Sequence, residues 1–107
     1  MQVQVDFCVI PINAGESLSP YIAECQQILD DAGLHCQLHA FGTNIEGEWE
    51  VVMAAIKHCH QRIHEMGAAR IHTQLKIGSR VDRPQSLQDK IDSVRARQSS
   101  QQSQQQQ

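Results

Sequence analysis

The N-terminal residues alternate between apolar and polar side chains, which is typical of a strand with one buried face. This pattern predicts a strand over residues 3–10, which Pro11 is expected to end. The apolar side comprises Val3, Val5, Phe7 and Val9, and the polar side comprises Gln2, Gln4, Asp6 and Cys8.

Two later segments carry apolar residues at the three-and-four spacing of an amphipathic helix. The first predicts a helix over about residues 20–32, with Ser19 as the cap before a proline and Gly33 as the left-handed C-terminal residue. The second predicts a helix from about Trp49 to about Met66, closed by Gly67. Its apolar stripe comprises Val52, Ala55, Ile56, Cys59, Ile63 and Met66.

Three further segments read as strands: residues 34–41, a short piece at 43–46, and residues 70–77. The predicted order is therefore β-α-β-β-α-β. Right-handed crossovers in this order place both helices on one face of a four-stranded antiparallel sheet. The expected fold is an α+β, ferredoxin-like sandwich.

The C-terminal part adds one short helix and a tail of unusual composition. Ser86 to Asp89 resemble a capping box, and Leu87, Ile91 and Val94 form an apolar stripe too short to stand alone. Residues 98–107 contain only glutamine and serine, so they have nothing apolar to bury. We therefore expect a folded domain over residues 1–97 and a disordered tail over 98–107, with the short helix docked on a neighbouring surface.

The sheet face opposite the predicted helices is polar but lightly charged, and two interpretations stay open. It is either a solvated face, as in many antiparallel sheets, or a face that a homo-oligomer packs together or uses around a ligand. Its expected members are Asp6, Cys8, His35, Gln37, His39, Arg70, His72, Gln74 and Lys76.

Composition narrows the class of protein. Nine basic residues against twelve acidic ones give a net charge of −3, and the basic residues are scattered, which argues against binding nucleic acid or a membrane surface. No apolar run approaches the roughly 20 residues of a membrane-spanning helix, and the N-terminus lacks a signal-peptide pattern. The four cysteines form no CxxC pair and are expected to be small buried residues of a cytosolic protein.

Catalytic and metal-binding motifs are not apparent. His60 and His64 have the helical spacing of two zinc ligands, but no third ligand lies at a suitable spacing and the catalytic glutamate of the protease motif is missing. No pattern connects a nucleophile to a base, and neither glycine-rich phosphate motif occurs. We therefore expect no enzymatic activity, no metal and no cofactor.

Residues 41–49 combine a polar strand, three carboxylates nearby and the single tryptophan, Trp49. An aromatic face attracts a small organic cation by roughly 0.5–2 kcal/mol, and a carboxylate adds charge and a hydrogen-bond acceptor. The alternative is that Trp49 anchors the start of the helix and that Glu46, Glu48 and Glu50 only favour its dipole.

Several short motifs together resemble the small thiamine-binding-protein-like family. The central one is Thr43-x-Ile45-Glu46-Gly47-x-Trp49. The others are the strand ending at Pro11, Gly67-Ala68-x-Arg70, Ile77-Gly78-x-Arg80-x-Asp82 and Gln88-Asp89-Lys90-Ile91-Asp92. The resemblance covers about residues 3–95.

The resemblance implies a ferredoxin-like subunit that assembles through its sheets into homodimers and homotetramers. In some members it also implies a pocket for thiamine or its hydroxymethylpyrimidine part, whereas many members have no assigned ligand. Thr43, Glu46 and Trp49 are carried over as motif positions, and His39 and Asn44 are added from their expected neighbourhood.

The resulting hypothesis is a non-enzymatic, cytosolic, oligomeric protein that binds thiamine or a related pyrimidine. Trp49 would supply an apolar wall, Glu46 would accept hydrogen bonds or balance the positive ring, and Thr43 would orient the ligand. The alternative is a structural or regulatory homo-oligomer without a vitamin ligand, in which Trp49→Ala would disturb assembly.

Overall fold

The sheet is built on its long first strand, β1 (Gln2–Ile12), in a computed structural model that describes residues 1–105, with side chains through Gln101. β1 pairs antiparallel with β3 (Gly42–Glu48) on one side and with β4 (Arg70–Ser79) on the other. β2 (His35–His39) completes the order β2-β3-β1-β4. This is the ferredoxin-like arrangement that the sequence predicts.

Pro11 does not end β1, contrary to the prediction. The strand continues to Ile12, and Pro11 lies opposite Ile71 of β4. β3 pairs only with the stretch from Gln2 to Phe7, so the other edge of β1 is unpaired near Pro11. The missing N–H of proline is tolerated at such an edge, because no ladder hydrogen bond is lost there.

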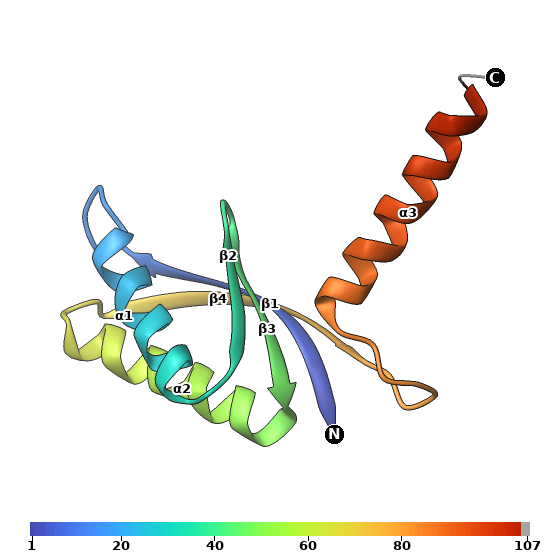
Figure 1. Ribbon diagram of the computed structural model, residues 1–107. Coiled ribbons are helices and arrows are strands. Elements are labelled where there is room, and N and C mark those ends of the chain that lie inside the picture. The colour runs from blue at the N-terminus through green and yellow to red at the C-terminus, as the bar shows by residue number, and fades with distance from the viewer. Residues whose placement is uncertain (106–107) are drawn as a thin grey trace.

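Helices α1 (Ser19–Asp31) and α2 (Trp49–Glu65) cover one face of the sheet, as Figure 1 shows. The alternating apolar side of β1 packs against them, and the predicted stripe of α2 is buried except for Met66, which is half-buried. The core residues include Val3, Val5, Phe7, Val9, Cys25, Leu29, Ile45, Val52, Ile56, Cys59 and Ile63.

Three of the four helix ends agree with the prediction: α2 begins at Trp49, and a glycine follows the C-terminus of each helix. Gly33 (φ 75°) and Gly67 (φ 112°) adopt the left-handed conformation after α1 and α2. The N-terminus of α1 differs, because Leu18 is the cap and no side chain caps it. Ser19 already belongs to the helix, so its hydroxyl is not placed to serve as the cap.

Strand β2 is shorter than the predicted strand over residues 34–41, and its side chains are more exposed to solvent than a half-buried strand predicts. It ends at His39, and the Leu38 side chain that was expected to face the core is 58% exposed. β2 is an edge strand with a neighbour on one side only, and Leu38 borders a surface groove beside α1.

Helix α3 (Leu87–Gln105) begins with the predicted capping box and runs much longer than the short helix expected. The Ser86 N–H donates to Asp89 Oδ2 (2.9 Å) and the Asp89 N–H donates to Ser86 Oγ (3.0 Å). Beyond Ile91, its described side chains are exposed, and Figure 1 shows the helix projecting away from the sheet.

α3 continues through residues 98–105 of the glutamine-rich segment. Glutamine has a high helix propensity, so it extends a helix that is already nucleated. Disorder of residues 98–107 in solution stays a prediction, and residues 106–107 lie outside the described part. Within residues 1–105, no helix is long and apolar enough to span a membrane.

The core position of Ile45 gives a stability test. Its side chain is fully buried in β3, so Ile45→Ala should lower the free energy of unfolding by about 2–5 kcal/mol through lost burial and a cavity. Urea denaturation measures this loss. The matched variant Val51→Ala, at a 43% exposed position of α2, should lose much less; equal losses would contradict the described packing.

Candidate ligand-binding site

Glu46 lies on the open face of the sheet, directly opposite Gln4 of β1. Residues opposite each other in an antiparallel pair point to the same face, with Cβ atoms about 4.5–5.5 Å apart. The Glu46 side chain is only 19% exposed. The pairing therefore places a carboxylate and a carboxamide side by side on the face that the two helices leave open.

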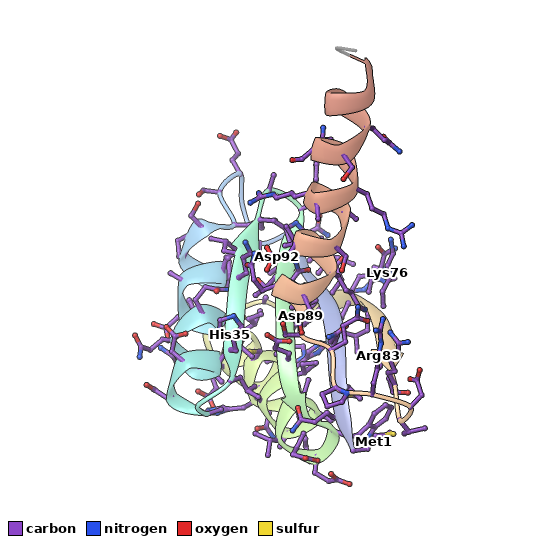
Figure 2. All side chains as sticks on the ribbon, turned by 45° about the vertical axis from the view of Figure 1, so that its right-hand side comes forward. Met1, His35, Lys76, Arg83, Asp89 and Asp92 are labelled. Atoms are coloured by element: carbon purple, nitrogen blue, oxygen red, sulfur yellow. The ribbon has the colours of Figure 1, made fainter. Side chains whose placement is uncertain are left out.

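Both side chains contact the chain segment that leads into α3. Glu46 Oε2 accepts a hydrogen bond from the Leu87 N–H (3.0 Å), and Gln4 Nε2 donates to the carbonyl oxygen of Gln85. The other carboxylate oxygen of Glu46 lies 3.7 Å from His35 Nε2. Figure 2 shows His35 and Arg83 on either side of the base of α3, where Asp89 lies.

A cleft of about 560 Å³ surrounds this pair and is called the polar cleft below. It lies between the start of β1, the end of β4 and the loop into α3. Charges of both signs line it: Glu46, Asp89, Arg80, Arg83 and Lys90. The cleft is therefore suited to a polar ligand of low net charge that makes directed hydrogen bonds.

Arg80 orders one wall of the polar cleft. Its guanidinium donates to both carboxylate oxygens of Asp82 and to Gln85 Oε1. These hydrogen bonds lower the pKa of Asp82 from 3.8 to about 2, so this carboxylate stays ionised near neutral pH. The loop that carries Gln85 toward Gln4 is thus held by a two-pronged ion pair.

His39 and Asn44 also lie on the open face, beyond the lining of the polar cleft. The Phe41 N–H donates to His39 Nδ1 (3.3 Å), so a neutral His39 ring carries its proton on Nε2. That Nε2 lies 2.9 Å from Asp6 Oδ1 and donates to it. Both ring nitrogens of His39 therefore have partners within the chain.

Thr43 faces the opposite side of the sheet, because it is three residues from Glu46 and side chains alternate along a strand. It is buried, and its Oγ1 accepts a hydrogen bond from Gln26 Nε2 of α1 (2.8 Å). Thr43 contributes to a groove of about 550 Å³ between α1 and the β2–β3 hairpin, bordered by Leu38 and Phe41. This hollow is called the apolar groove below.

Trp49 lines neither the polar cleft nor the apolar groove. It is the first residue of α2, packs half-buried against the core, and donates its backbone N–H to the Met1 carbonyl oxygen (2.9 Å). Beside it, the Met1 amino group donates to Glu48 (2.7 Å), which raises the pKa of the amino group and lowers that of Glu48. These contacts fix the start of α2.

The five predicted site residues therefore do not share one pocket. Glu46 lies in the polar cleft, Thr43 in the apolar groove, His39 and Asn44 elsewhere on the open face, and Trp49 at the start of α2. Sequence reasoning missed Gln4, whose only signal is its place on the polar side of β1. It also missed the hydrogen bonds that the Gln85 carbonyl oxygen and the Leu87 N–H make to Gln4 and Glu46. The capping box predicts the start of the helix there, but not these contacts.

His60 and His64 of α2, which have the spacing of two zinc ligands, each have a partner within the chain. His60 Nε2 lies 2.5 Å from Thr73 Oγ1, and His64 Nδ1 lies 2.7 Å from the Ala68 carbonyl oxygen. All four cysteines are free, and burial raises the pKa of Cys36 to about 11, helped by the nearby charge of Asp30. Within the described residues, no three His, Cys, Asp or Glu side chains gather as metal ligands.

Comparison with known proteins finds the same small domain in bacteria, archaea and a fungus. The UPF0045 protein sll0230 of Synechocystis is 49% identical over 94 residues, covering 88% of this chain and 78% of its own. The UPF0045 protein ECM15 of Eremothecium gossypii is 40% identical over 91 residues, covering 84% and 87%.

Solved structures agree with the fold. The MJ1052 protein of Methanocaldococcus jannaschii has a TM-score of 0.80 at 25% identity, covering 87% of this chain and 95% of its own. A Thermotoga maritima protein, whose name proposes a role in thiamine biosynthesis or salvage, has a TM-score of 0.75 at 21% identity, covering 88% and 99%.

A sequence profile described as "Thiamine-binding protein" matches residues 5–95, nearly the whole domain that carries the polar cleft. The relatives at 49% and 40% identity cover most of the same length. This chain therefore belongs to the thiamine-binding-protein family.

Proposed function

We propose that this protein is a non-enzymatic binding protein of the cytosol that holds an aminopyrimidine, either thiamine or its hydroxymethylpyrimidine part, in the polar cleft. The observation that carries the proposal is the pair formed by the Glu46 carboxylate and the Gln4 carboxamide. Family membership supports the ligand class. The four free cysteines suit a reducing compartment.

The chemistry of the pair matches the edge of an aminopyrimidine. Such a ring carries an exocyclic amine, which donates hydrogen bonds, next to a ring nitrogen, which accepts one. A carboxylate accepts from the amine and a carboxamide donates to the ring nitrogen, much as glutamine reads the amine and ring nitrogen of adenine. Glu46 and Gln4 offer these two functions from neighbouring strands.

The mixed charge of the cleft shapes the expected selectivity. The negative charges of Glu46 and Asp89 are balanced by the basic residues around them. A positively charged ring therefore gains little net electrostatic stabilisation in the cleft. Trp49 lies elsewhere and supplies no aromatic wall here. We therefore expect free hydroxymethylpyrimidine to bind about as tightly as thiamine.

Isothermal calorimetry with hydroxymethylpyrimidine and thiamine tests the proposal. Glu46→Gln should weaken binding of both by about tenfold or more, because a hydrogen bond to a charged acceptor is lost. Glu50→Gln is the matched control: it removes the same charge from an exposed position of α2 outside the cleft and should leave the affinity unchanged.

Two outcomes would contradict this assignment. No heat from either ligand would remove the binding function. Binding that survives Glu46→Gln but is lost in Thr43→Val would place the ligand in the apolar groove, because Thr43 lies on the other face of the sheet.

We further propose that copies of the chain associate through the open face. Figure 1 shows no helix layer over most of this face, and α3 leaves it near one end. The exposed side chain of Val94 (66%) on α3 is also a large apolar group that a neighbouring copy would cover. If ligand screens stay silent, association of this kind supports the alternative of a structural or regulatory oligomer.

Sedimentation velocity at micromolar concentration tests this association and should show dimers or larger species. Gln74→Arg, on the open face opposite Cys8, should shift the protein toward monomer by adding a charge at the contact. Gln61→Arg adds the same charge to the exposed side of α2 and should not. A monomeric wild-type protein, or equal behaviour of the two variants, would contradict sheet-to-sheet assembly.

A further inference from the structure

The two side chains of the proposed ligand-binding pair are hydrogen-bonded to the chain itself. The Leu87 N–H donates to Glu46, and the Gln85 carbonyl oxygen accepts from Gln4. We propose that residues 85–87 are an internal competitor for the ligand, so that an aminopyrimidine entering the polar cleft displaces this segment and undocks α3. This inference rests on the proposed function of the cleft.

The segment presents the same chemistry as the proposed ligand. To Gln4 it offers an acceptor, the Gln85 carbonyl oxygen, as the pyrimidine ring nitrogen would. To Glu46 it offers a donor, the Leu87 N–H, as the exocyclic amine would. One donor and one acceptor, two residues apart in the chain, thus satisfy the two groups that an aminopyrimidine edge would satisfy.

The surroundings of Glu46 leave little room for both partners at once. Its side chain is about four-fifths covered, with Leu87 at one carboxylate oxygen and His35 near the other. An amine that approaches this carboxylate must therefore move one of these neighbours. The exposed His35 side chain can turn aside, but a ligand that uses Glu46 and Gln4 together takes the places of the Leu87 N–H and the Gln85 carbonyl oxygen, so it displaces this segment.

The way α3 is attached makes its release inexpensive. Among its described residues, only Leu87 and Ile91 are half-buried, and the others are exposed. The capping box of Ser86 and Asp89 is local, so it travels with the helix and keeps its N-terminus capped after release. Weakly attached segments of this kind are the ones that open most readily.

A pair of substitutions at Leu87 separates the competing N–H from the side chain. Leu87→Pro deletes the donor to Glu46 at the first helical position, where proline is well tolerated. Leu87→Ala keeps the N–H but loses the same half-buried side chain. We expect Leu87→Pro to bind hydroxymethylpyrimidine about tenfold more tightly than Leu87→Ala in calorimetry, because the competitor is removed.

Hydrogen exchange monitors the helix itself. Saturating hydroxymethylpyrimidine should increase amide exchange over residues 89–95 of the wild-type protein while exchange in α2 stays unchanged. Without any ligand, Glu46→Ala should produce the same local increase, because it removes the acceptor that holds Leu87. This second variant keeps the inference testable if Leu87→Pro does not fold.

The outcomes separate this inference from the function on which it rests. If the pyrimidine binds but exchange in α3 is unchanged, or if the two Leu87 variants bind equally well, the competition is refuted and the binding function stands. Unchanged exchange over residues 89–95 in Glu46→Ala also refutes it. If neither thiamine nor hydroxymethylpyrimidine binds the wild type or any variant, the proposed function fails, and the competition fails with it.

Discussion

The antiparallel register between β1 and β3 is the constraint on which the rest of the molecule depends. It sets Val5 opposite Ile45 on the helix-covered face and Gln4 opposite Glu46 on the open face. Because side chains alternate, a shift of one residue would turn the apolar set toward solvent and the polar pair into the core. The burial of the core residues thus positions the carboxylate and carboxamide of the polar cleft.

The second constraint is electrostatic and follows from the partial burial of Glu46. A carboxylate that has lost most of its water needs hydrogen-bond donors in return. The Leu87 N–H in the first turn of α3 supplies one, at a helix end where unsatisfied N–H groups and the helix dipole both favour a negative partner. Docking of α3 is therefore coupled to the charge of Glu46 more than to the helix's modest apolar contact.

The sequence predicts the periodic parts of the fold well because local patterns carry them. The stripe from Val52 to Ile63 identifies α2, and left-handed glycines mark the helix ends. The misses are positions where tertiary context decides: Pro11 is accepted in β1 because β3 pairs only with residues 2–7 and does not reach that end of β1. The length of α3 is another such difference: the apolar stripe ends at Val94, whereas glutamine, with its high helix propensity, extends the helix to Gln105.

The candidate site is predicted less completely, for a similar reason. Alternation places Thr43 and Glu46 on opposite faces, so a motif that is contiguous in sequence is divided in space. The Gln4–Glu46 pair appears only once the strand register is known, and the Leu87 contact only once the path of the loop is known. Patterns within one segment identify Glu46 but not its partners.

The structure also separates Glu46 from the other residues of the Thr43–Trp49 motif. Ile45 fills the core, Trp49 anchors α2, and Thr43 ties β3 to α1 through Gln26. At Gly47, an added Cβ would lie 2.5 Å from Leu34 Cδ2, so a larger residue would require the Leu34 side chain to move. Packing accounts for each of these positions, whereas Glu46 lies on the open face, where its carboxylate accepts from the Leu87 N–H at the N-terminus of α3 and lies near His35. Under the proposed function, this charge has two roles: it holds the first turn of α3 in the structure, and it accepts from the amine of an aminopyrimidine when that ligand displaces the helix.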